Sequence, residues 1–260
     1  MRIGRIQNNY TAEGFDAVVA AGLHSIEICC NGEEDVEALV AAKEDVKAQI
    51  ARTGIPVVSV GRWNHTVLKD GAIDPFALCY YHKLLDCAIE LGANVFVVGC
   101  NLDTSVSLYQ NYSLAIGFFY DLLKRADGRI RVAVQNCDWN NFIVSPEQWK
   151  IVLGELPELM LKYDPSHAYN RGDDYLAEIS QWGERIAHVH VKGTVHAGKR
   201  GVDDPPAGMD DIRWPAVLAV LYARGYRGDL SIEPHSKTWS GELGERGVAF
   251  TKQYIEQVLV

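Results

Sequence analysis

The sequence lacks the features that mark several large classes of protein. None of its hydrophobic runs approaches the ~20 residues that a membrane span needs. The opening segment MRIGRIQNNY turns polar early, unlike a secretory signal peptide. Positive charge is scarce: 25 Lys and Arg stand against 34 Asp and Glu, a net charge of −9, whereas nucleic-acid binding needs a basic patch. We therefore expect a cytoplasmic protein that binds neither membranes nor nucleic acids.

The six cysteines do not form a single CxxC pair. A zinc site built on thiolates is therefore poorly supported. Most of the cysteines lie in or beside apolar segments, so we predict buried free thiols in a reducing compartment. Cys137 follows Gln135 closely and is the one thiol expected to face a pocket.

Short apolar runs alternate with longer amphipathic segments along the whole chain. The predicted strands are RIGRI, SIEIC, PVVSV, NVFVV, RVAVQN, LMLKYD, IAHVHV and DLSIEP. The predicted helices cover Phe15–Ala21, Glu34–Arg52, Pro75–Leu91, Ser107–Ala126, Pro146–Leu153, Asp173–Trp182, Asp211–Arg224 and Gly244–Leu259. Glycines at 54, 92 and 225 stand where helices should end, each shortly before a strand. The pattern indicates repeated units of one helix and one strand.

Strict alternation of eight strands and eight helices in about 250 residues is typical of a (β/α)₈ barrel. A doubly wound sheet is the alternative, but its Gly-rich phosphate turn is missing from RIQNNYTAEG after the first strand. No linker or low-complexity segment divides the chain. We predict an α/β fold, a single TIM-barrel domain over residues 1–260. The segment Thr194–Asp211 is the longest predicted loop and is expected near the barrel mouth.

Side chains that bind metals end three of the predicted strands. They are Asp164 and His167 in LMLKYDPSH, His188 and His190 in IAHVHVKG, and Glu233 and His235 in LSIEPH. In a barrel these strand ends surround one active site, and neighbouring strands are about 5 Å apart. Gln135 ends a fourth strand, RVAVQNC, at the same rim. Oxygen and nitrogen ligands without thiolate predict a divalent ion, with Mn²⁺ first and Mg²⁺ or Co²⁺ as alternatives.

Three segments resemble the xylose isomerase-like TIM barrel superfamily, often labelled sugar phosphate isomerase/epimerase. They are KYDPSH (162–167), HVHVKG (188–193) and GYRGDLSIEPH (225–235). The resemblance implies that Asp164, His190 and Glu233 are metal ligands. It also implies that His167 contacts the substrate and that Lys192 points near it.

The chain departs from the epimerases of this superfamily at two positions. They carry a Glu at the place of Gln135, and an Arg six positions after the metal His, where this chain has His196. An amide can offer its carbonyl oxygen to a metal but does not titrate near neutral pH. A missing general acid or base costs about 10²–10⁴ in rate. Glu233 remains as a base, and the candidates for the second group are His167, Lys192, His196 and Asp138.

The main prediction is a metal-dependent isomerase or epimerase that abstracts a proton next to the carbonyl of a small sugar, ketose or polyol. A lyase or dehydratase that eliminates from a keto-sugar, inosose or 3-keto-glycoside is the alternative, since elimination needs only one base. A non-catalytic barrel with a decayed site is the third reading. DNA repair, an activity of other relatives, is disfavoured by the acidic charge.

The remaining polar and aromatic residues near strand ends are predicted to bind the substrate. They are Trp63, His65, Asn136, Trp139, His196 and His235. Basic residues are scattered, so an unphosphorylated sugar or polyol is expected. A homo-oligomer is compatible with the sequence, which does not determine the number of subunits.

Overall fold

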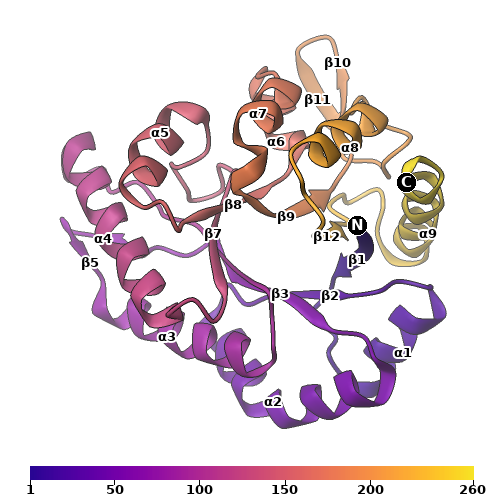
Figure 1. The fold of residues 1–260 in the computed structure, drawn as a ribbon, viewed down its shortest axis with the longest axis horizontal. Helices are drawn as coiled ribbons and strands as arrows, with labels where there is room; N and C mark the ends of the chain where they lie inside the picture. Colours follow the sequence, from indigo (N-terminus) through magenta and orange to yellow (C-terminus); the bar gives the residue numbers. More distant parts are fainter.

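A computed structural model describes residues 1–260 and confirms the predicted barrel. Eight parallel strands close in the order β1-β12-β9-β8-β7-β6-β3-β2, and the helices form a ring outside them (Figure 1). The barrel strands are β1 (Arg2–Ile6), β2 (Ile26–Cys29), β3 (Val57–Arg62), β6 (Val95–Val98), β7 (Arg131–Gln135), β8 (Met160–Tyr163), β9 (Ile186–Val191) and β12 (Asp229–Ile232).

The helices begin and end close to the predicted positions. They are α1 (Ala12–Ala20), α2 (Glu33–Thr53), α3 (Pro75–Glu90), α4 (Leu108–Ala126), α5 (Pro146–Glu155), α6 (Pro165–Arg171), α7 (Tyr175–Trp182), α8 (Trp214–Ala223) and α9 (Gly241–Val258), with a 3₁₀ turn η1 (Gly183–Arg185). Gly54, Gly92 and Gly225 have φ of 72°, 74° and 76°. These left-handed conformations, which glycine adopts without strain, end the helices where the sequence predicted.

Two hairpins and one short helix were not predicted. The hairpin β4 (Leu68–Lys69) and β5 (Ala72–Ile73) lies outside the barrel. The predicted loop Thr194–Asp211 instead contains a second hairpin, β10 (Val195–Ala197) and β11 (Arg200–Asp203). Helix α6 follows β8 directly because the Asp164 side chain accepts a hydrogen bond from the Ser166 N–H and so caps it.

The cysteines are all free, as predicted, but two of them are not buried. Cys79 is exposed on α3 and Cys29 is half-buried at the end of β2. Both cysteines were predicted to be buried because their sequence neighbours are apolar. Apolar neighbours do not determine the direction in which a single side chain points. None of the helices is long and apolar enough to cross a membrane.

The barrel interior packs around Trp63. A small buried cluster joins its indole to Val95, Val97, Ala133 and Ala187. A Cβ at Gly61 would lie 2.4 Å from the Trp63 ring and 2.8 Å from the Val97 carbonyl oxygen. Glycine at position 61 of β3 therefore leaves the space that the Trp63 indole occupies.

Gly61→Ala is expected to lower the free energy of unfolding by about 1–3 kcal/mol, the usual cost of overpacking a core. Gly154→Ala is the matched control, because nothing lies within 4 Å of its added Cβ on α5 and alanine is the better helix residue. Urea denaturation measures both variants. Unchanged stability in Gly61→Ala would contradict this account of the packing.

Candidate active site

Asp164, His190 and Glu233 come together at the C-terminal ends of β8, β9 and β12. One ligand atom from each lies within 4.8 Å of the others. Asp164 Oδ1 accepts the hydrogen bond that caps α6, whereas the buried Asp164 Oδ2 makes no hydrogen bond. A buried carboxylate oxygen without a hydrogen-bond donor is unusual. The Lys192 ammonium is 3.4 Å from Oδ2, beyond a normal hydrogen bond, so Oδ2 can still turn a lone pair to a bound cation. The three predicted ligands can therefore hold a metal ion.

The orientation of the His190 ring is set by two carboxylates. Its Nε2 lies 2.8 Å from Glu27 Oε2, and its Nδ1 lies 3.0 Å from Glu233 Oε2. A carboxylate only accepts, so Nε2 carries the hydrogen that it donates to Glu27. By the same rule Nδ1 donates to Glu233 in this arrangement. A metal ion bound between them would take the place of the Nδ1 proton. Burial lowers the pKa of His190, but Glu27 and Glu233 outweigh burial and raise it.

Glu27 is the functional residue that the sequence reasoning missed. It is fully buried on β2, and its Oε2 also lies 2.8 Å from His188 Nε2. Ser59 Oγ donates to its other oxygen at 3.2 Å. Burial would raise the pKa of Glu27, but His188 and His190 hold it well below the usual range. Glu27 thus carries a negative charge behind His190, as second-layer carboxylates do in metal sites.

His167 and Lys192 lie on the other side of Asp164. Lys192 Nζ is 3.1 Å from His167 Nε2 and 3.4 Å from Asp164 Oδ2. An ammonium only donates, so His167 Nε2 accepts and is unprotonated in this contact. Burial, with help from the Lys192 charge and against that of Asp164, lowers the pKa of His167 to about 3. His167 is therefore a neutral imidazole at physiological pH.

A cavity of about 270 Å³ opens over these groups. The predicted residues that line it are Trp63, Gln135, Trp139, His167, Lys192, Glu233 and His235, and Cys137 lines it as expected. The indole of Trp139 stands edge-on to the His235 ring, with centroids 4.8 Å apart. A larger cavity of about 460 Å³ lies among the first residues of the strands. That is the end of a barrel where TIM-barrel enzymes do not place their active sites.

Three predicted substrate contacts lie elsewhere. Asn136 is fully buried, and both ends of its amide bond the Asp164 backbone at 2.9 Å. It positions Asp164 and keeps no polar atom for a substrate. His65 turns toward Glu33, 3.4 Å away, and His196 toward Asn170, 2.7 Å away. Neither histidine lines the cavity.

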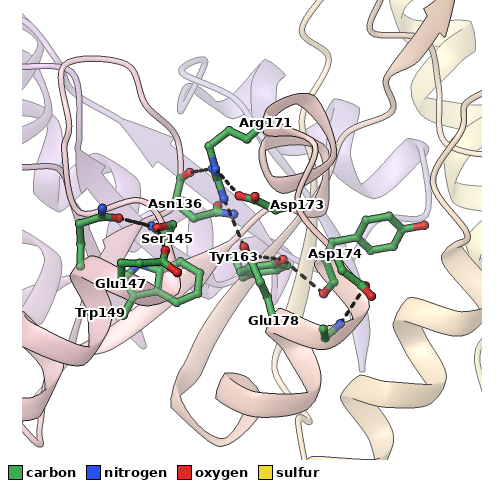
Figure 2. A network of polar contacts seen from close by, with 12 residues as sticks. Asn136, Ser145, Glu147, Trp149, Tyr163, Arg171, Asp173, Asp174 and Glu178 are labelled. Carbon is green, nitrogen blue, oxygen red and sulfur yellow. Dashed lines mark hydrogen bonds and ion pairs between the residues drawn. The ribbon is translucent and has the colours of Figure 1, made fainter. Parts of the chain in front are cut away.

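A polar network behind the site fixes Asn136 and Arg171 (Figure 2). Arg171 donates to the Asn136 carbonyl oxygen at 3.1 Å and to Asp173 at 2.9 Å. Tyr163, at the end of β8, donates to Glu178 at 2.8 Å. Arg171 lines the cavity, but its charge is already neutralised by Asp173 and Glu178.

A protein family with this barrel fold matches most of the sequence. Residues 15–254 match the xylose isomerase-like TIM barrel family. The chain belongs to that family. Among curated proteins it is similar to the uncharacterized protein YfiH of Bacillus subtilis, with 28% identity over 175 residues, 57% of this chain and 55% of YfiH. The chain thus spans about half the length of that relative.

Solved structures of similar proteins share the whole barrel. The 3-keto-D-glucoside 4-epimerase YcjR from E. coli superposes with a TM-score of 0.77 at 16% identity, covering 99% of each chain. The D-allulose 3-epimerase from Methylomonas sp. in complex with D-allulose gives 0.78 at 16% identity, covering 100% of this chain and 97% of that one. At such identities the likeness concerns the fold.

Proposed function

We propose that this protein is a divalent-metal-dependent isomerase or epimerase that abstracts a proton next to the carbonyl of a small sugar, ketose or polyol. The observation that carries the proposal is the unbonded Asp164 Oδ2 beside His190 Nδ1 and Glu233, next to a cavity with aromatic walls. Aromatic faces and polar groups are what a sugar ring packs against and bonds. The names of similar structures, among them a D-allulose 3-epimerase, support the same class.

The donor set favours Mn²⁺, with Mg²⁺ or Co²⁺ as alternatives, because it offers carboxylate oxygens and one imidazole and no thiolate. Asp164, His190 and Glu233 would hold the ion, with the Gln135 carbonyl oxygen as a fourth donor. The Gln135 amide nitrogen donates to the Trp63 carbonyl at 3.1 Å, which leaves Oε1 available. A bound divalent ion would polarise the substrate carbonyl.

The protein's own residues supply the proton chemistry. Glu233 is the proposed base: burial would raise its pKa, but Lys192 and His190 hold it well below the usual range, so it is ionised. Neutral His167 can bond a substrate hydroxyl or exchange a proton with it. Lys192 anchors His167 and Asp164 and stands at the cavity wall.

A deuterium-exchange screen tests the proposal. The protein is incubated in D₂O with Mn²⁺ and a panel of ketoses, inososes and 3-keto-glycosides. Deuterium at the carbon next to the carbonyl, with the carbon skeleton intact, supports isomerase or epimerase chemistry. Exchange with none of the substrates would contradict the proposal.

A metal-dependent lyase or dehydratase is the second candidate. The observation that favours it is Gln135, because an amide at this position cannot act as a second base beside Glu233. Beta-elimination needs one base and a leaving group. Loss of water or of an aglycone in the same screen would identify this chemistry.

Glu27→Gln is expected to lower Mn²⁺ affinity about 10–100-fold, the usual effect of altering a residue behind a metal-binding histidine. The variant keeps the shape of the side chain but removes the charge that polarises the His190 Nε2–H. Isothermal titration calorimetry with Mn²⁺ measures the change. Glu37→Gln on the exposed face of α2 is the control, and equal affinities in both variants would contradict the role of Glu27.

A further inference from the structure

Lys162 is a buried lysine at the site that has no direct polar partner. It lies on β8 and is 2% exposed, and its side chain reaches the cavity wall. No hydrogen bond or ion pair with another residue satisfies its ammonium. The Trp63 ring lies 5.8 Å from Nζ to the centroid. The Lys162 charge also helps to lower the pKa of Asp164 and of Glu233, but neither carboxylate forms an ion pair with it. Buried lysines are normally paired, because an unpaired buried charge is costly.

The strand register shows which residues stand opposite Lys162, and none of them is a carboxylate. Lys162 stands opposite Gln135 of β7 and opposite His188 of β9. Paired residues of neighbouring parallel strands point to the same side of the sheet. A carboxylate at position 135 would neutralise Lys162, but the Gln135 amide is neutral and its nitrogen bonds Trp63.

The other charged groups at the cavity have partners or are exposed to solvent. Lys192 lies against Asp164 and His167, and Glu233 against His190. Arg171 is paired with Asp173. Asp138 is exposed. Lys162 is therefore the one buried charged side chain lining the cavity that has no direct hydrogen-bond or ion-pair partner, and it is free to bind a ligand.

We propose that Lys162 binds a carboxylate of the substrate, so that the site takes a keto sugar acid in preference to a neutral ketose. This rests on the proposed function and names its substrate class. A hydroxyl would accept a hydrogen bond from Lys162 but would leave its charge uncompensated. A phosphate is larger and doubly charged and is usually held by several donors, whereas a carboxylate matches one ammonium.

Two matched ligand pairs test the inference. 2-Keto-D-gluconate and D-fructose differ in a carboxylate or a hydroxymethyl group at C1. 5-Keto-D-gluconate and L-sorbose differ in the same way at the opposite end from the carbonyl. Binding of all four to the Mn²⁺-loaded protein is measured by calorimetry. The acid of at least one pair is expected to bind about tenfold or more tightly than its neutral partner, as for a hydrogen bond between charged groups.

Lys162→Met is expected to abolish that preference, so that the acid and its neutral partner bind with affinities within about twofold of each other. Lys199→Met, on the hairpin outside the cavity, should keep the preference. Lys162→Arg retains the charge and serves if the Met variant does not fold. Equal binding of acid and neutral partner by the wild type in both pairs, or a preference that survives Lys162→Met, would overturn the inference.

The two experiments distinguish the absence of a carboxylate site at Lys162 from the absence of isomerase activity. Deuterium exchange into neutral ketoses without any carboxylate preference removes the role of Lys162 and keeps the isomerase proposal. Tight, Lys162-dependent binding of a sugar acid without exchange into any carbonyl compound keeps the carboxylate site and removes the isomerase proposal.

Discussion

Glu233→Gln is expected to lower the rate of solvent deuterium exchange by about 10²–10⁴, the usual contribution of a general base. The carboxylate lines the cavity wall and lies 3.0 Å from His190 Nδ1. An amide of the same shape cannot accept the substrate proton. The fold should survive, since the side chain is at the rim and partly exposed.

Two further measurements separate the base from the metal ligand in this variant. Glutamine keeps a carbonyl oxygen, so Mn²⁺ binding should weaken less than the exchange rate falls. Glu245→Gln, which removes a carboxylate paired with Arg5 at the surface, is the control for charge alone. Wild-type exchange in Glu233→Gln would remove Glu233 from its role as the base, whatever its effect on the metal.

The candidate ligands at the strand ends could be predicted to lie together, because chain order places them at one rim. Asp164, His190 and Glu233 each follow or end an apolar run, and a closed barrel brings the ends of three neighbouring strands together. The alternation of strands and helices placed six candidate side chains at this rim, and the resemblance to the superfamily selected these three. The prediction did not need the register or the direction of any side chain.

Glu27 and Lys162 were missed because they lie inside strands. Both stand in short apolar runs, SIEIC and LMLKY, where a single charged residue does not show which face it occupies. The register decides their role: Glu27 stands opposite Ser59, and Lys162 opposite Gln135 and His188. Pairing across strands is a property of the closed barrel. For the same reason the sequence did not show that Asn136 bonds the Asp164 backbone.

The hairpin β10–β11 shows a second limit of sequence reasoning. Its segment holds several Gly, Pro and Asp residues, which are typical of loops, and its strands have only three and four residues. Short strands carry little alternating pattern. The segment was predicted to be a loop near the barrel mouth. Its position agrees with that prediction, because Asp204, just after β11, lines the cavity.

Gln135→Glu is expected to tighten Mn²⁺ binding at least about tenfold, because an added anionic ligand strengthens a divalent site. The rise in melting temperature between EDTA and Mn²⁺ should therefore be larger in the variant. Gln148→Glu in the α5 cap is the control, because its oxygen still accepts from Ser145.

The same variant tests whether residues 135 and 162 act as a pair. The introduced carboxylate would stand opposite Lys162 in the register and neutralise its ammonium. Any preference for a sugar acid should then disappear, as it does when the lysine itself is removed. Tighter metal binding with an undiminished preference would show that Lys162 does not face position 135 in the folded protein. An unchanged Mn²⁺ affinity would place Gln135 outside the ligand set and leave three protein ligands, from β8, β9 and β12.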